Sequence, residues 1–169
     1  MARPVVKYGA AVLRAEARPV ETVTPEVQAL VDEMIAAMYA ERGIGLAAPQ
    51  IGVGLRIFVI DLSSGRDPGA LHVCINPEWG ERDGLQLEEE GCLSLPGFSA
   101  TVARPARAVV HALDRDGVRR RLEGTGLLAR ALQHEMDHLD GRLYVDRLRG
   151  LNRTMILSRI RKLEKDGKW

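Results

Sequence analysis

The sequence has no long apolar run, no marked excess of either charge and only two cysteines in 169 residues. No stretch approaches the roughly 20 apolar residues that a membrane-spanning helix needs. The first segment, MARPVVKYGAAVLRAEARPV, is interrupted by Pro4 and by charged side chains, so it lacks the apolar centre of a signal peptide. We therefore expect a cytoplasmic protein without a membrane partner.

The charges nearly cancel, because 24 Lys and Arg residues stand against 23 Asp and Glu residues and give a formal net charge of +1. A general nucleic-acid binder normally carries a basic excess or a basic stripe. Direct nucleic-acid recognition is therefore not predicted. No repeat, low-complexity tract or linker divides the chain, so we predict a single domain over residues 1–169.

The two cysteines, Cys74 and Cys92, are predicted to differ in role. They could form one disulfide, but a reducing cytoplasm favours free thiols or a metal ligand. Cys74 lies inside the apolar run LHVCIN, which is typical of a core thiol. Cys92 follows a glycine and precedes Pro96 and Gly97, which keep the segment from becoming helical. A thiolate in such a loop can bind a metal, although a buried apolar cysteine is the alternative.

Three helices are predicted. The first begins in TPEVQALVDEMIAAMYAER, where Thr24 is a good N-cap and Pro25 suits the first position. Its apolar residues recur at helical spacing: Val27, Leu30, Val31, Met34, Ile35 and Met38. A second helix is expected from about Leu127 to Leu139, ended by Gly141 at a cap position. A third is expected over roughly 151–165.

Between the first two helices the pattern is typical of strands. RIFVID (56–61), LHVCIN (71–76) and LQLEE (85–89) are short and β-prone. ARAVVHALDRDGVRRRLEG (106–124) predicts a hairpin with a tight turn at Asp116-Gly117. This order predicts an α+β fold, with mostly antiparallel strands around a central helix and with an N-terminal and a C-terminal helix.

The second helix contains QHEMDHLDG (133–141), in which His134 and His138 are four residues apart. Four residues advance a helix by about 400°, so the two imidazoles project side by side and can bind one metal ion. Glu135, between them, can reach a water molecule held by the metal. The alternative is a charged helix face that contains two histidines by chance.

A catalytic site of the zinc or iron type needs three protein ligands and an open position. Zinc peptidases with such a helix take the third ligand from downstream, but no histidine follows Gly141 here. The third ligand is therefore expected upstream, where EEEGCLSLPG offers Cys92. His72 and His111 lie in strand-like runs without partners, and we expect them to be structural or surface residues.

A third segment, GIGLAAPQIG (43–52), follows the first helix. Gly43 and Gly45 permit close approaches of the backbone that larger residues would block. Gln50 offers an amide donor. Taken alone, the segment is a weak signal, because most such segments are turns that lead into a strand.

Together, GIGLAAPQ, EGCLSLPG and QHEMDHLDG resemble the three signature motifs of the peptide deformylase family, in the family's order. The resemblance covers essentially the whole chain. It implies a catalytic domain that removes the N-formyl group from the formyl-methionine of nascent peptides and releases formate. It also implies one divalent metal ion, Fe(II) in the cell, which zinc, nickel or cobalt can replace. Contact with the ribosome near the exit tunnel stays open.

The resemblance implies a role for each matching residue. The implied metal ligands are Cys92, His134 and His138. Glu135 becomes the general acid and base, while Gln50 and the backbone N–H of Leu93 become donors to the developing oxyanion. The implied substrate-binding residues are Ile44, Gly45, Gly91, Leu127 and Ala131. The resemblance also implies that Glu90 pairs with Arg104 and holds the cysteine loop.

Two positions depart from the family pattern. Ser99 stands near the place where the family often has an arginine that meets the peptide substrate. Arg130 enters the metal-binding helix where many bacterial members have an apolar residue. If Arg130 nears the mouth of the pocket, we expect its stem to pack and its charge to stay in water.

Two alternatives are carried forward. The first is a zinc peptidase that uses the same helix, against which the missing downstream ligand counts. The second is a catalytically inactive, metal-stabilised interaction module. The presence of Glu135 and Gln50 counts against it, because a structural metal needs neither residue.

Overall fold

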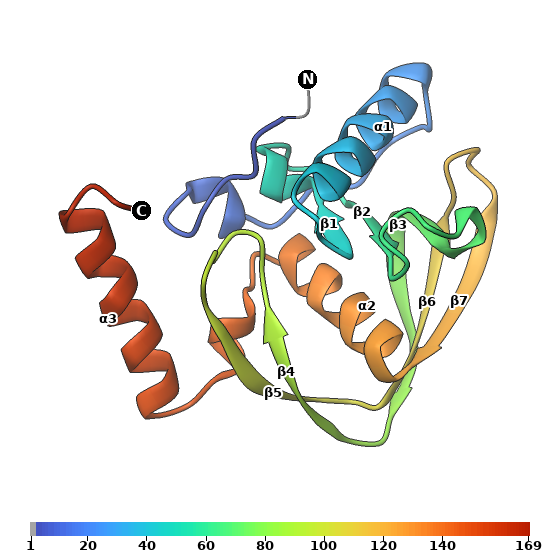
Figure 1. Ribbon diagram of the computed structural model, residues 1–169. Coiled ribbons are helices and arrows are strands. Elements are labelled where there is room, and N and C mark those ends of the chain that lie inside the picture. Colours follow the sequence, from blue (N-terminus) through green and yellow to red (C-terminus); the bar gives the residue numbers. More distant parts are fainter. Residues whose placement is uncertain (1–2) are drawn as a thin grey trace.

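The computed structural model describes residues 3–169 and places α2 (Gly126–Leu139) in the middle of the molecule, between two sheets (Figure 1). The other helices are α1 (Pro25–Ala40) and α3 (Leu151–Lys165). The strands are β1 (Gly45–Ala47), β2 (Ile57–Asp61), β3 (Leu71–Asp83), β4 (Gln86–Gly91), β5 (Ser99–Arg104), β6 (Arg107–Leu113) and β7 (Arg119–Thr125). Short 3-10 helices are η1 (Ala11–Leu13), η2 (Ala48–Ile51), η3 (Pro68–Ala70) and η4 (Tyr144–Arg147).

The strands form two antiparallel sheets. A five-stranded sheet has the order β1-β2-β3-β6-β7, and β4 pairs with β5 in a separate two-stranded sheet. Each strand pair is antiparallel, and the helices stand before and after the strands in sequence. The predicted α+β fold is therefore confirmed. Within residues 3–169, no helix is both long and apolar enough to cross a membrane.

The predicted helices form close to their expected ends. The Thr24 hydroxyl accepts a hydrogen bond from the Val27 N–H at 3.3 Å, which satisfies one of the free donors of the first turn of α1. Helix α2 begins one residue earlier than predicted. It ends at Leu139, and Gly141 lies one residue beyond the cap residue Asp140, with a left-handed φ of 74°. Helix α3 matches the prediction.

The strands differ from the predictions in several places. β1 and β5 were not predicted as strands, because each becomes one only through its partner in the sheet. β3 runs seven residues beyond Asn76, to Asp83, because register shifts let it stay paired with β6. The loop between β6 and β7 has five residues, 114–118, rather than a two-residue turn. Asp114 sets this loop, since its carboxylate accepts the N–H groups of Asp116 and Val118.

The core lies on both faces of β2, whose five residues are all buried. Phe58 and Ile60 pack in the cluster that contains the apolar face of α2, whereas Ile57 and Val59 pack in the cluster that contains α1. Successive strand side chains point to opposite faces, so the two helices cover opposite sides of the sheet. Because α2 is anchored by its apolar side, its histidine-bearing side faces the β4–β5 hairpin.

Candidate metal centre and active site

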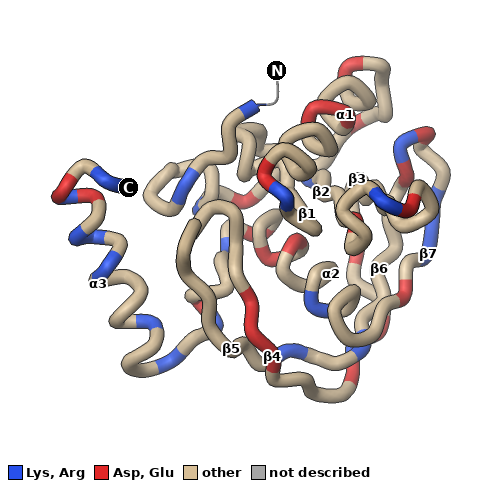
Figure 2. Tube along the Cα trace, in the orientation of Figure 1, with Lys and Arg blue, Asp and Glu red and all other residues tan. Residues whose placement is uncertain are grey.

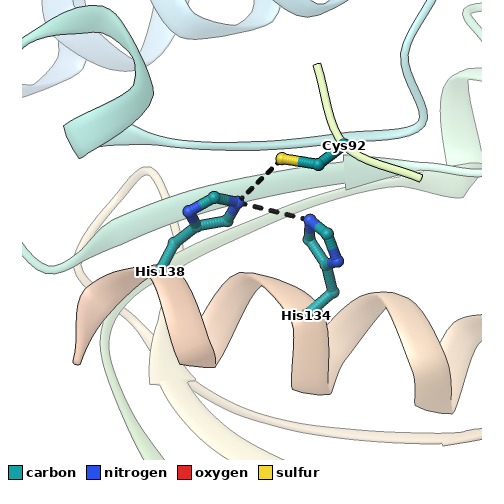
Figure 3. A group of neighbouring side chains, drawn as sticks. All are labelled: Cys92, His134 and His138. Atoms are coloured by element: carbon teal, nitrogen blue, oxygen red, sulfur yellow. Dashed lines mark hydrogen bonds between the residues drawn. The ribbon is translucent and has the colours of Figure 1, made fainter. Parts of the chain in front are cut away.

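Cys92, His134 and His138 converge on one point although they come from two distant segments (Figure 3). The two imidazoles project from the same side of α2, with their Nε2 atoms 3.2 Å apart. The Cys92 Sγ atom, which lies just after β4, approaches His138 Nε2 to 3.4 Å. The three ligand atoms all lie within 4.8 Å of one another. The spacing of four residues along α2 places the two histidines side by side. The β4–β5 hairpin brings the Cys92 thiol next to them.

The geometry of these atoms fits a metal ion. In a tetrahedral site, metal–nitrogen distances of about 2.0–2.1 Å and a metal–sulfur distance of about 2.3 Å place the ligand atoms about 3.3–3.6 Å apart. The separations of 3.2 and 3.4 Å are close to these values. One thiolate and two imidazoles are also a donor set that iron, zinc, nickel and cobalt accept. The described residues thus contain a Cys/His/His group suited to a divalent transition metal.

Glu90 orients the first histidine. Its Oε2 atom accepts a hydrogen bond from His134 Nδ1 at 2.5 Å, which leaves the lone pair of His134 on Nε2, toward the metal position. The Arg104 guanidinium donates to both oxygens of Glu90, at 2.7 and 2.6 Å, so the predicted Glu90–Arg104 pair is confirmed. Burial alone would raise the pKa of Glu90, but bonds from Arg104 and His134 outweigh it and hold that pKa well below its usual range.

The expectation for Arg130 is wrong, because its charge does not stay in water. The residue is 3% exposed, and its guanidinium donates to Gln86 Oε1, Glu90 Oε1 and the Val102 carbonyl oxygen. The β4–β5 hairpin folds over this part of α2 and supplies all three acceptors. A buried guanidinium is tolerated when its donors are satisfied in this way. Arg130 therefore belongs to the network that holds Glu90.

Glu135 lies beside the metal position without joining the ligand group. Its side chain is almost fully buried, with Oε1 4.0 Å from His134 Nε2. Oε2 has no hydrogen-bond partner among the described residues. Burial raises the pKa of Glu135 to about 7. A cation bound at the neighbouring ligands acts in the opposite direction. A buried carboxylate with a free oxygen is suited to accept a proton from a bound water molecule.

Gln50 is fixed against the cysteine loop. Its Oε1 atom accepts the Ala47 N–H at 3.0 Å, which orients the amide. The amide nitrogen then lies 3.6 Å from Cys92 Sγ and donates to Ser94 Oγ at 3.2 Å. The Leu93 N–H has no hydrogen-bond acceptor within residues 3–169, so it is free to meet a ligand. Ser94 had no predicted role, although it lies inside the motif that carries Cys92.

These residues line one cleft of about 570 Å³. Every residue predicted for catalysis, metal binding or substrate binding lines it except His138, which is almost fully buried. The five predicted substrate-binding residues are all in its wall: Ile44, Gly45, Gly91, Leu127 and Ala131. Leu127 is half exposed at the mouth, and Ala131 lies buried deeper on α2. The cleft combines an apolar wall with convergent polar groups, as binding sites commonly do.

The remaining candidates lie elsewhere. Cys74 is buried in β3, and burial raises the pKa of its thiol to about 12, as expected for a core cysteine. His72 and His111 are partly exposed residues of the five-stranded sheet and join no metal-binding group in the described part of the chain. Asp137 is a buried residue that sequence reasoning missed. Its carboxylate accepts from Arg104 and Arg147, which ties α2 to β5 and to η4.

Comparisons with known proteins identify the family. Residues 2–154 match the polypeptide deformylase family. The chain is 49% identical over 169 residues to a peptide deformylase of Acidobacterium capsulatum, covering 100% of this chain and 99% of that protein. It is 48% identical over 151 residues to one of Thermodesulfovibrio yellowstonii, covering 89% and 92%. The chain belongs to the polypeptide deformylase family.

Solved structures of peptide deformylases share the fold. One from Legionella pneumophila gives a TM-score of 0.91 at 43% identity, covering 98% of this chain and 96% of that chain. One from Synechococcus elongatus in complex with actinonin gives 0.89 at 39% identity, covering 95% and 90%. Deformylases are metal-dependent hydrolases that remove the N-formyl group from nascent polypeptides, and this chain is such an enzyme. Neither the zinc-peptidase alternative nor the inactive-module alternative gains support.

Proposed function

We propose that residues 1–169 act as one catalytic domain in which Cys92, His134 and His138 hold the metal and Glu135 moves the proton. The observation that carries this proposal is the convergence of three ligand atoms beside a buried carboxylate with a free oxygen. A divalent ion held there would supply Lewis-acid chemistry, polarising the attacking water and the formyl oxygen.

Glu135 acts as general base and then as general acid. Its free Oε2 atom takes a proton from the attacking water and delivers it to the amine that leaves when the formamide C–N bond breaks. Formate and a free α-amino group are the products. The carboxylate is almost fully buried beside the ligand group, which holds the proton close to the leaving amine.

Gln50 and Leu93 stabilise the negative charge that develops on the formyl oxygen. The Ala47 N–H fixes the Gln50 amide, so its nitrogen points at the cysteine loop before substrate arrives. The free N–H of Leu93 lies on the same loop. Donors that are oriented in advance in a buried site lower the barrier more than flexible donors do, because they need no reorganisation.

The substrate binds as an extended strand. Within residues 3–169, β1 pairs only with β2, and β4 only with β5, so each has a free edge. Gly45 of β1 and Gly91 of β4 line the cleft. An extended peptide between them can pair with both edges. Its methionine side chain then enters the apolar pocket formed by Ile44, Leu127 and Ala131. A formyl carbon bears only hydrogen, and a close-fitting site around it excludes acetylated chains by size.

We infer that Fe(II) is the native ion and that the enzyme works in the cytoplasm on chains leaving the ribosome. Thiolate and imidazole ligands favour iron, zinc, nickel and cobalt over magnesium or calcium, which supports a transition metal. Contact with the ribosome is supported by the basic residues that lie along α3 (Figure 2), because they are exposed. Co-sedimentation with ribosomes, before and after neutralising these side chains, tests that contact.

One experiment tests the catalytic proposal. The protein is purified without oxygen, its metal content is measured, and formate release from formyl-methionyl peptides is followed on the same sample. We expect about one metal ion per chain, with iron the main species. An unformylated peptide with internal bonds serves as the control and should stay intact. Cleavage of the control with no formate release would contradict the proposal.

A further inference from the structure

β4 carries a carboxylate that the proposed mechanism does not use. Glu89 lines the cleft and is exposed, within the acidic run that marks β4 in Figure 2. It lies between Glu88 and Glu90 in sequence, but the three side chains do not face the same way. Successive residues of a strand point to opposite faces. The Glu90 side chain is buried on the inner face of the β4–β5 hairpin, so the Glu89 side chain points to the outer face.

The charges of these two neighbours are compensated differently. Glu90 accepts hydrogen bonds from Arg104 and Arg130, two buried cations. Glu89 accepts from the Ser99 hydroxyl at 2.5 Å, and no salt bridge joins it to a cation within residues 3–169. A hydroxyl is neutral, so it orients the carboxylate without cancelling its charge. Glu89 thus keeps a full negative charge on the rim of the cleft.

The proposed strand-like substrate brings a specific side chain to this rim. If the methionine side chain points inward, to Leu127 and Ala131, the next side chain must point outward. Glu89 stands on the outer face of β4 and lines the cleft, so it and that side chain share one side of the paired strands. The other charged residues on the rim are Glu41 and Arg42, which are adjacent and opposite in sign. The charges of Glu41 and Arg42 largely offset each other, so the charge of Glu89 is the one on the rim that no opposite charge offsets.

We propose that Glu89 selects substrates with a lysine or arginine directly after the formyl-methionine. This inference rests on the proposed function and on the extended binding mode. An exposed ion pair of this kind changes kcat/KM by about twofold to fivefold. The effect falls on KM, because the contact is made equally in the bound substrate and in the transition state. It weakens with added salt, since the pair is exposed.

The test uses three peptides with amidated C-termini, formyl-Met-Lys-Ala, formyl-Met-Gln-Ala and formyl-Met-Glu-Ala, and the metal-loaded enzyme. We expect kcat/KM to decrease in that order. Glu89→Gln should remove most of the difference between the lysine and glutamate peptides, and Glu89→Lys should reverse it. Glu88→Gln is the matched control: it removes the same charge from the same strand, but Glu88 does not line the cleft. This variant should keep the preference.

Each outcome decides a different question. Equal kcat/KM for the three peptides would overturn the inference and leave the proposed function intact. An equal loss of preference in Glu88→Gln and Glu89→Gln would also overturn it, because a general acidic field, not one carboxylate, would then be responsible. Failure to release formate from the neutral glutamine peptide would overturn the proposed function and this inference together.

Discussion

Glu135 and Gly45 contact each other so closely that no side chain fits between them. A Cβ atom built on Gly45 would lie 2.8 Å from Glu135 Oε1 and 3.2 Å from its Cδ atom. Real Cβ atoms essentially never approach other heavy atoms to less than 3.0 Å. The backbone of β1 thus forms one wall of the space that holds the carboxylate. The Glu135 carboxylate can lie where it does only if residue 45 is a glycine. This requirement is independent of any part that Gly45 plays in binding substrate.

Gly45→Ala should therefore damage catalysis more than stability. The new methyl group pushes the carboxylate, which is the flexible end of its side chain, away from its position, so the fold survives. We expect kcat to fall by about 10–100-fold, the scale of a displacement of about 1 Å. Metal content and melting temperature should change little. Gly54→Ala is the control, because a Cβ at Gly54 meets nothing within 4 Å. Equal activity of the two variants would contradict this role.

Glu135→Gln should keep the metal and lose the reaction. The amide has nearly the same shape as the carboxylate but cannot accept the proton of the attacking water. We expect kcat to fall by about 10²–10⁴-fold, the usual scale for a general acid and base. Metal analysis and formate release on the same sample make the measurement. Near-normal turnover with full metal content would remove Glu135 from the mechanism.

The two cysteines should respond differently to the same change. Cys92→Ser replaces a thiolate with a neutral hydroxyl, so metal content and most activity should be lost. Cys74→Ser places a hydroxyl in the core and should lower stability by about 1–3 kcal/mol while activity persists. Metal content, activity and urea unfolding of both variants provide the comparison. The opposite pattern would show that the ligand assignment is wrong.

Gln50→Ala should lower kcat by about 10²–10³-fold with little change in KM, because the charge that the amide meets develops in the transition state. Metal content should be retained, since Gln50 is not a ligand. Ser94→Ala is an informative second variant, because it removes the hydroxyl that accepts from the Gln50 amide but leaves the Ala47 contact. It should cost less than Gln50→Ala. Loss of metal in Gln50→Ala would show a structural role instead.

Asp61→Asn should lower stability in a way that depends on pH. Burial alone would raise the pKa of Asp61, but hydrogen bonds from Ser63, Tyr39 and Gly65 outweigh it and lower that pKa to about 2. In the unfolded chain it is about 3.9. The folded state is thus stabilised by the charged carboxylate above about pH 4, and this contribution is lost as the pH falls through about 2.

We expect Asp61→Asn to lower the free energy of unfolding by about 1–3 kcal/mol at neutral pH. The amide puts an NH2 group in place of one carboxylate oxygen, where it meets the hydrogen-bond donors of Tyr39, Ser63 or Gly65. Urea unfolding of the wild type and of Asp61→Asn is compared from about pH 7 down to about pH 3. The difference between their free energies of unfolding should be constant at first and should narrow below about pH 4. Tyr39→Phe removes one of the bonds that lower the pKa. In that background the folded pKa is higher, so the difference should still begin to narrow near pH 4 but should narrow by less and stop narrowing at a higher pH. A pH-independent difference would exclude the carboxylate's charge as the cause.

Interactions between residues close in sequence were sufficient to predict the helices and the pairing of the two histidine ligands. Thr24 and Pro25 set the start of α1, because capping depends on residues close in sequence. His134 and His138 could be paired from the sequence, because four residues bring two side chains to the same side of a helix. Glu90 could be paired with Arg104 only through the family resemblance, since their contact joins different strands.

Only the tertiary structure decided which segments far apart in the sequence pair or contact one another. β1 becomes a strand because β2 offers it hydrogen bonds, and nothing in GLA itself demands this. Arg130 looked like a residue for the pocket mouth, yet the β4–β5 hairpin covers it and supplies three acceptors. The same hairpin carries Cys92 to α2. Such contacts depend on how two sheets close over one helix, which no local pattern encodes.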